Sequence, residues 1–157
     1  MPAFLPWSAE RAAEIIASEA GREGALLPIL HALQAAFGYV DRAAEPLIAD
    51  ALNLTRAEVH GVVTFYHDFR SEPAGKRVLR LCRAEACQAA GGDALIDHVE
   101  QRLGTSIGST APGGMVTLEA VYCLGLCATA PSAMLDGRVV GRLDVAGVDA
   151  LLDEVER

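Results

Sequence analysis

The spacing of apolar residues divides the chain into two regions. From residue 8 to about residue 66, apolar positions recur every three or four residues, which is the period of an α-helix. The clearest segment, ALLPILHALQAAF, aligns leucines and Phe37 along one stripe and stops at Gly38. The pattern predicts four short helices, which can pack into a small bundle.

Capping residues give the predicted bounds of the other three helices. Ser8 can cap a first helix that is closed by Gly21. A third helix is predicted around EPLIADAL, with Pro46 in its first turn. Thr55 and Glu58 have the spacing of a capping box, which predicts that a fourth helix begins there and covers RAEVHGVVTFYHDF.

A polar segment, RSEPAGK, separates this region from the next, in which the period changes. RVLRLC predicts a strand, GDALIDHVEQRLG a helix between glycines, and GMVTLEAVYC a second strand. AMLDGRVVGRL predicts a hairpin with a two-residue turn at Asp136 and Gly137, and a last helix is capped by Asp144. The predicted order β-α-β-β-β-α gives an α+β fold: a helical bundle in residues 1–70, followed by an α/β domain in residues 71–157.

The composition excludes several classes of protein. Of the 157 residues, 52% are hydrophobic and 22% are charged, which is typical of a globular chain. The formal charge of −8 argues against a nucleic-acid-binding protein. The N-terminus lacks a basic start and an unbroken apolar run, and ALLPILHALQAAFGYV is too short to span a bilayer. We therefore expect a cytoplasmic protein without direct membrane insertion.

Four cysteines stand in two pairs. Cys82 and Cys87 lie in CRAEACQAAGG, and Cys123 and Cys127 lie in YCLGLCATAP, each pair at the end of a predicted strand. In a reducing cytoplasm, structural disulfides are disfavoured. A dithiol oxidoreductase requires two residues between its cysteines at the start of a helix, and neither pair has that spacing. Structural zinc would accept four thiolates, and the spacing does not exclude it.

A 2Fe–2S cluster takes two thiolates on each iron, which two loops with two cysteines each would supply. Its sulfurs also need backbone N–H donors. Gly91, Gly92, Gly125 and Ala128 allow the backbone to approach, and the helix predicted from Gly92 directs its positive end toward the site. No lysine or histidine adjoins the cysteines as a catalytic base would. On the residues alone, zinc stays open and the cluster is favoured.

The cysteine motifs carry a family resemblance. CRAEAC, followed by YCLGLCATAP and a hairpin, resembles the thioredoxin-like 2Fe–2S ferredoxins. LLPILHALQAAFGYV and VHGVVTFYHDF resemble the helical region in one branch of that family, the small iron–sulfur subunits of NADH dehydrogenase modules. The resemblance covers roughly residues 20 to 145. It implies a thioredoxin-like α/β domain with one 2Fe–2S cluster, bound by Cys82, Cys87, Cys123 and Cys127.

This branch of the family is found in respiratory complex I, NAD-reducing hydrogenases and NAD-dependent formate dehydrogenases. Complex I subunits commonly have small hydroxyl residues and a proline between the first two cysteines, whereas CRAEACQAAGG is more similar to the gamma subunit of molybdenum- or tungsten-containing formate dehydrogenases. The resemblance therefore implies electron transfer beside an FMN- and NAD-binding subunit, with a larger molybdenum or tungsten subunit in the same complex. The chain has no GxGxxG motif or P-loop, so no independent active site is expected.

Residues outside the cysteine motifs have simpler interpretations. His60 and His67 lie seven positions apart on one predicted helix and are expected to cap, pack or face a partner rather than bind metal. Arg83 lies between two cysteines, where its charge could stabilise the reduced cluster or meet an acidic partner. Phe4 and Trp7 are expected to pack, with anchoring onto another subunit as the alternative. The helical region is expected to dock the chain onto the flavin subunit.

Overall fold

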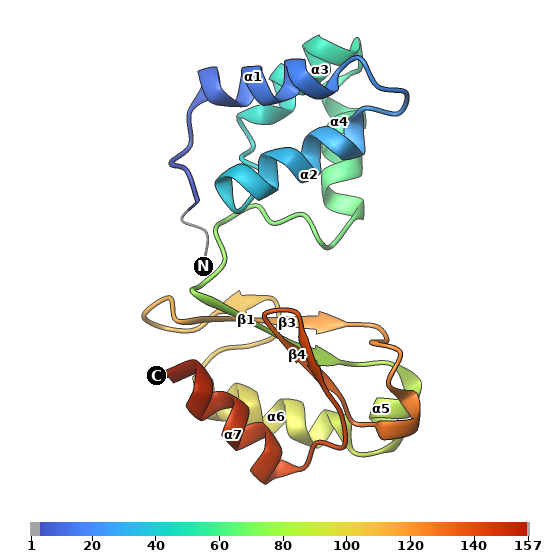
Figure 1. Ribbon diagram of the computed structural model, residues 1–157, viewed down its shortest axis with the longest axis vertical. Coiled ribbons are helices and arrows are strands. Elements are labelled where there is room, and N and C mark those ends of the chain that lie inside the picture. The colour runs from blue at the N-terminus through green and yellow to red at the C-terminus, as the bar shows by residue number, and fades with distance from the viewer. Residues whose placement is uncertain (1–3, 157) are drawn as a thin grey trace. The chain divides into compact units, whose positions relative to one another are not determined.

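The computed structural model describes residues 4–156 and confirms an α+β fold (Figure 1). The chain forms two compact units that divide between Pro73 and Ala74, within the segment RSEPAGK. Each unit has its own hydrophobic core. Within the described residues, no helix is both long and apolar enough to cross a bilayer.

The first unit, here called the helical unit, contains α1 (Ala9–Glu19), α2 (Leu26–Phe37), α3 (Ala44–Leu52) and α4 (Arg56–Phe65). The stripe predicted on the second helix faces the core, where Leu30, Leu33 and Phe37 are fully buried. Leu26 and Leu27, at the start of the stripe, are half-buried. Side chains of the other three helices complete this core: Ile16, Ile48 and Val59.

Polar caps hold the helix starts as predicted. The N–H of Arg11 donates to Ser8 Oγ at 3.3 Å. Thr55 and Glu58 form a reciprocal capping box, in which the N–H of Thr55 donates to Glu58 Oε2 at 2.8 Å and the N–H of Glu58 donates to Thr55 Oγ1 at 3.2 Å. A cap of this kind stabilises a helix by about 1 kcal/mol.

One helix end matches the prediction and another differs from it. The C-cap of α1 is Ala20, so the helix stops directly before Gly21 as predicted, although Gly21 does not adopt the left-handed conformation of a typical glycine cap. The fourth helix ends at Phe65 and not at Phe69, because Tyr66 takes an extended conformation. The chain then turns so that the Phe69 ring enters the core, with its centroid 5.0 Å from that of His31. Burial of an aromatic ring outweighs one further helical turn.

The second unit, here called the sheet unit, carries a five-stranded sheet with strand order β2-β3-β1-β4-β5. Strands β1 and β3 are parallel, and the other neighbours are antiparallel. Two helices, α6 and α7, cover one face of the sheet (Figure 1). Along the chain the elements are β1 (Arg77–Cys82), α5 (Glu85–Ala89), α6 (Gly92–Leu103), β2 (Ser109–Thr110), β3 (Val116–Val121), the 3-10 helix η1 (Cys127–Thr129), β4 (Ala133–Leu135), β5 (Arg138–Val140) and α7 (Val145–Glu156).

The predicted order of elements is confirmed except for three short additions, α5, β2 and the 3-10 helix η1. A five-residue helix and a two-residue strand are too short to produce a readable apolar period. The hairpin turn is confirmed: Asp136 and Gly137 both have positive φ, 49° and 89°, as a type I′ turn requires. Asp144 caps the last helix through its Oδ1, which accepts the N–H of Gly147 at 2.8 Å.

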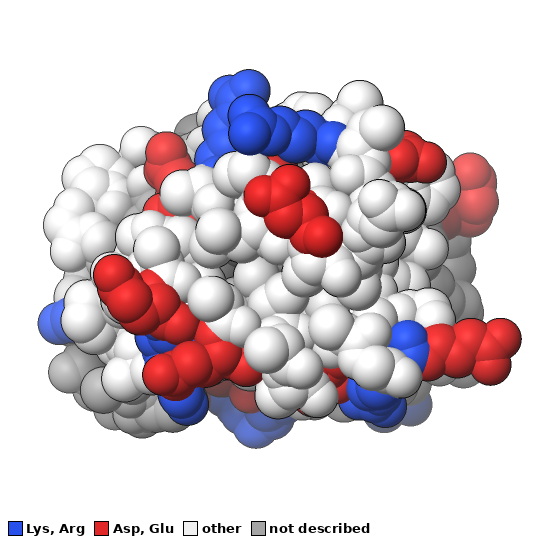
Figure 2. All heavy atoms as spheres, turned by 90° about the horizontal axis from the view of Figure 1, so that it is seen from above, with Lys and Arg blue, Asp and Glu red and all other residues white. Residues whose placement is uncertain are grey.

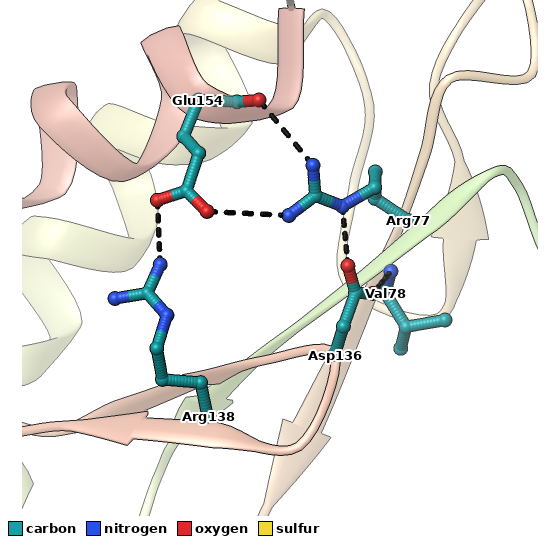
Figure 3. A network of polar contacts seen from close by, with 5 residues as sticks. All are labelled: Arg77, Val78, Asp136, Arg138 and Glu154. Atoms are coloured by element: carbon teal, nitrogen blue, oxygen red, sulfur yellow. Dashed lines mark hydrogen bonds and ion pairs between the residues drawn. The ribbon is translucent and has the colours of Figure 1, made fainter. Parts of the chain in front are cut away.

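A network of charged side chains ties the start of β1 to the hairpin and the last helix (Figure 3). Arg77 donates to Asp136 and, at 3.4 Å, to Glu154 Oε1. Arg138 donates to the other Glu154 oxygen at 2.5 Å, and the N–H of Val78 donates to Asp136 Oδ1 at 2.8 Å. The network therefore holds the start of β1, which is the end of the strand that is remote from Cys82.

Candidate metal centre

The parallel pairing of β1 with β3 brings the two cysteine pairs to one edge of the sheet. Cys82, the last residue of β1, is in register with Val121, the last residue of β3. The N–H of Arg83 then donates to the carbonyl of Val121 at 2.8 Å. Since both strands end at the same edge, α5 and the segment after β3 lie at the same end of the sheet (Figure 1). Residues separated by about forty positions in sequence thereby become neighbours.

The first pair is buried. Cys82 ends the strand and Cys87 lies in α5, with 4% and 2% of their surfaces exposed. α6 starts close against this pair, because a Cβ atom at Gly92 would lie 2.6 Å from the carbonyl oxygen of Cys87. Only glycine fits this close approach, which explains the glycine at the start of that helix.

The second pair is exposed and held in an unusual backbone conformation. Cys123 has φ of 95°, in the left-handed region that costs a residue with a side chain about 1–3 kcal/mol. The N–H of Gly125 donates to Cys123 Sγ at 3.3 Å. Cys127 opens η1, and its sulfur lies 3.6 Å from that of Cys123. This separation is far longer than a disulfide bond, and all four cysteines are free thiols.

The separation of 3.6 Å fits two ligands of one tetrahedral metal, because sulfurs bound at about 2.3 Å lie about 3.7 Å apart. The N–H donor from Gly125 meets a further requirement of an iron–sulfur cluster, whose sulfurs accept backbone hydrogen bonds. The sulfur separation and the Gly125 donor together fit the second pair to its share of a two-iron cluster. Within residues 4–156, no three cysteine, histidine or carboxylate side chains are arranged around one metal position.

Hydrogen bonds favour the thiolate form of Cys82. Burial raises the pKa of Cys82, but it is outweighed by the backbone N–H of Ala84, by the Cys87 side chain and by the backbone N–H groups of Cys123 and Leu124. The pKa of Cys82 therefore lies below the ordinary value for a cysteine. Two of these donors come from the loop of the second pair, so that loop helps to stabilise a thiolate of the first pair.

The pKa of Cys127 is shifted in the opposite direction. The hydrogen bond with Cys123 and the negative charge on that residue raise the pKa of Cys127, and burial and the charges of Cys87 and Cys82 raise it further. The four sulfurs thus repel one another when they are ionised together. A bound cationic centre would remove this repulsion, which is the chemistry expected of a thiolate metal site.

The structure gives His60 and Trp7 structural partners, but not His67 or the Nε atom of Arg83 in the described residues. His60 Nδ1 lies 2.9 Å from Oε1 of the buried Glu45, whereas His67 is exposed. The ring centroids of Trp7 and Phe37 lie 5.1 Å apart, so Trp7 packs on the helical core. The Nε atom of Arg83 is buried and has no hydrogen-bond partner within the described residues. Next to the first cysteine pair, the Nε–H of Arg83 therefore has no hydrogen-bond acceptor among the described residues.

One residue at the site was missed in the sequence. Ser132 is 3% exposed, and its hydroxyl lies 3.5 Å from Cys87 Sγ. Its carbonyl also accepts the N–H of Cys82 at 3.0 Å. An isolated serine gives no signal in a sequence, and only its position directly after Pro131, at the start of a predicted strand, could have drawn attention to it.

Comparisons with known proteins agree on the family. The profile described as thioredoxin-like [2Fe-2S] ferredoxin matches residues 12–156 and confirms the thioredoxin-like fold. The chain is 33% identical over 141 residues to the NADP-reducing hydrogenase subunit HndA of Solidesulfovibrio fructosivorans, covering 90% of this chain and 82% of that protein. It is 37% identical over 132 residues to a subunit of the NADH-quinone oxidoreductase of Rhizobium meliloti, covering 84% of this chain and 79% of the relative.

A solved structure shows the same fold. The crystal structure of an air-oxidized NAD+-reducing [NiFe]-hydrogenase matches with a TM-score of 0.68 and 27% sequence identity. The match covers 83% of this chain and 22% of the hydrogenase chain, so the hydrogenase chain is much longer. The chain likewise spans 50% of the corresponding NADH-quinone oxidoreductase subunit of Mycobacterium tuberculosis, to which it is 38% identical over 125 residues.

Proposed function

The chain belongs to the thioredoxin-like [2Fe-2S] ferredoxin family, and on this basis we propose that it transfers single electrons within an NAD-dependent oxidoreductase complex. Members of this family carry one 2Fe–2S cluster. The relatives named above are subunits of NADH-quinone oxidoreductases and of hydrogenases that reduce NAD or NADP. The observation that carries the proposal is the meeting of two cysteine pairs at one edge of the sheet.

Cys82, Cys87, Cys123 and Cys127 are the proposed ligands of the cluster. The buried pair would hold one iron and the exposed pair the other, so that one side of the cluster lies in the protein and the other near the surface. The cluster supplies the redox chemistry when it is bound, and the chain sets its potential through burial, charge and hydrogen bonds to sulfur. Backbone donors such as the N–H of Gly125 are part of that control.

The partner in electron transfer is proposed to be an FMN- and NAD-binding subunit. The relatives belong to enzymes whose names state that they oxidise NADH or reduce NAD or NADP. Transfer between a two-electron carrier and a one-electron acceptor requires an intermediate cofactor such as a flavin. This chain has no nucleotide-binding motif, so the flavin and the nucleotide would lie on the partner.

The helical unit is proposed to dock the chain onto that partner. Phe65 and Tyr66 at the end of α4 are 73% and 43% exposed, which is unusual for large aromatic residues and typical of anchors at protein interfaces. Beside them lies an open hollow of about 390 Å³, whose apolar lining includes Leu27, Leu54 and Val62. Figure 2 shows a face of the molecule on which acidic and basic side chains stand in separate patches within uncharged surface.

Within this class of complexes, we propose a cytoplasmic NAD-dependent formate dehydrogenase with a molybdenum or tungsten subunit, in which this chain is the gamma subunit. The support is the segment CRAEACQAAGG, which lacks the hydroxyl residues and proline common between the first two cysteines of complex I subunits. The equivalent subunit of complex I or of an NAD-reducing hydrogenase is the alternative, and the relatives named above favour it.

Purification of the complex through an affinity tag on this chain separates these assignments. We expect FMN and a molybdenum or tungsten cofactor to co-purify with the chain. The purified complex should also reduce NAD with formate. Nickel with hydrogen-dependent NAD reduction would assign the chain to a hydrogenase, and quinone-dependent NADH oxidation would assign it to complex I. A chain recovered with zinc, and without flavin or reductase activity, would contradict electron transfer altogether.

A further inference from the structure

Ser132 has features of a residue that acts on the cluster and not only on the fold. It directly precedes β4, is 3% exposed, and places its hydroxyl oxygen 3.5 Å from Cys87 Sγ. A buried hydroxyl requires a hydrogen-bond partner, because leaving it unpaired costs free energy. Within the described residues, the sulfur of Cys87 is the partner that the structure offers.

The backbone on both sides fixes the position of this serine. Its carbonyl accepts the N–H of Cys82 at 3.0 Å. The N–H of Leu143 donates to the carbonyl of the preceding Pro131 at 3.1 Å. Ser132 is therefore tied to both cysteines of the buried pair, to one through its backbone and to the other through its side chain. The serine end of this contact is held by these backbone bonds directly before β4, and the sulfur end is held in α5.

Water does not offer the hydroxyl a good alternative. The hollow beside Ser132 has a volume of about 10 Å³, at the lower limit for one water molecule. Its lining is mainly apolar and includes Leu95, Ile96 and Leu143. A water in that space would lack the two to four polar partners that it needs.

We propose that Ser132 donates a hydrogen bond to the thiolate of Cys87 and thereby raises the reduction potential of the cluster. The inference rests on the proposed function, in which Cys87 is a ligand. A thiolate can only accept, so the serine must be the donor once Cys87 binds iron. The one-electron reduced cluster carries one more negative charge than the oxidised cluster. A donor directed at a ligand sulfur therefore stabilises the reduced state more.

The test compares reduction potentials of loaded proteins, measured by a dithionite titration followed by absorbance and EPR. Ser132→Ala removes the donor. The pair Ser132→Thr and Ser132→Val repeats the test with side chains of the same shape, of which only threonine can donate. Thr117→Val is the control, because Thr117 is also a buried hydroxyl of the same sheet but bonds to the N–H of Gly75 at 2.7 Å and not to sulfur.

We expect the equilibrium constant for reduction to fall roughly threefold to tenfold in Ser132→Ala, which is about 30–60 mV for one electron. The valine variant should lie below the threonine variant, and Thr117→Val should match the wild type. Equal potentials in the wild type and Ser132→Ala, or equal potentials in the threonine and valine variants, would overturn the inference. So would a shift of the same size in Thr117→Val. Failure of the proposed function is distinguishable, because the wild type would then bind no iron.

Discussion

The helical unit and the sheet unit differ in how several of their polar groups are paired and in the backbone conformation near them. In the helical unit, polar side chains find partners nearby: Gln34 bonds to the carbonyl of Asp68 at 2.7 Å and to the N–H of Arg70 at 2.8 Å, and His60 lies 2.9 Å from Glu45. In the sheet unit, Cys123 is in the left-handed region and Arg83 has a buried nitrogen without a partner in the described residues.

Both of these departures lie at the cysteine motifs, since Arg83 directly follows Cys82, whereas the other residues with a side chain and positive φ, Asn53, Asp136 and Arg142, lie at turns and helix ends. Strained backbone and unpaired polar atoms cost free energy, and folded proteins retain them mainly where function requires them. The opposite pKa shifts of Cys82 and Cys127 are found at the same place. The comparison supports the proposal that the chemistry lies in the sheet unit and that the helical unit docks the chain.

The largest effect is expected from Cys87→Ser. A hydroxyl is a harder and poorer ligand for iron than a thiolate, so the variant should lose most of its cluster. Iron content and visible absorbance after anaerobic purification measure the loss. His67→Ala, in the helical unit, is the matched control and should keep the wild-type spectrum, since His67 is exposed and is not among the proposed ligands. Bleaching by the histidine change and not by the cysteine change would reverse the roles of the two units.

Removal of the helical unit tests the division of roles. A chain that starts at Gly75 retains the sheet, its core and all four cysteines. It should bind the cluster with an unchanged spectrum, but it should bind the flavin subunit at least about tenfold more weakly in a pull-down. Loss of the cluster would mean that the helices complete its surroundings. Undiminished binding would mean that the sheet unit alone makes the interface.

A smaller effect is expected from Thr55→Ala, which removes the capping box at the start of α4. The helical unit should lose about 1 kcal/mol of stability in a urea titration followed by circular dichroism, while the cluster absorbance stays unchanged. Thr64→Ala is the control in the same helix, because the Thr64 hydroxyl donates only to the carbonyls of the preceding turn, those of His60 and Gly61. An equal loss in both variants would contradict the importance of the cap.

The smallest effect concerns acid stability of the sheet unit. A hydrogen bond from His98, and another from Arg102, lower the pKa of Asp149. A carboxyl group with a lowered pKa stabilises the folded state above its unfolded pKa of about 3.9, and this contribution is lost as the pH falls through the folded value. Asp149→Asn should therefore flatten the fall in stability below about pH 4.

The effect of Asp149→Asn on stability should be small because the Asp149 side chain is partly exposed and solvent screens its interactions. Urea unfolding at several pH values between about 2.5 and 6 measures it. Asp50→Asn, an exposed aspartate of α3, is the control in the helical unit. A steeper fall in stability for Asp149→Asn than for the wild type would contradict the sign of the effect.

Local rules allowed much of the fold to be predicted. The capping box at Thr55 and Glu58 and the turn at Asp136 and Gly137 depend on residues a few positions apart, and both are present. The parallel pairing that sets Cys82 beside Val121 joins residues far apart in sequence, and no local pattern encodes it. The left-handed conformation of Cys123 could not be predicted either, since a residue other than glycine rarely adopts it.

At the site, the sequence identified the cysteines but not what surrounds them. The spacing of the two pairs predicted a thiolate site, and the structure brings their loops together. The contact of Ser132 with Cys87 arises only when β4 pairs with β1, so it depends on tertiary structure. The ligand set remains a prediction until metal is measured.

Metal analysis of the wild-type protein tests the central claim most directly. After anaerobic purification, the chain should contain about two irons and two acid-labile sulfides, the composition of a 2Fe–2S cluster held by four thiolates. Reduction with dithionite should bleach its brown colour and produce a low-temperature EPR signal of a spin-half centre. One zinc per chain, with no iron and no signal after the same handling, would contradict the account.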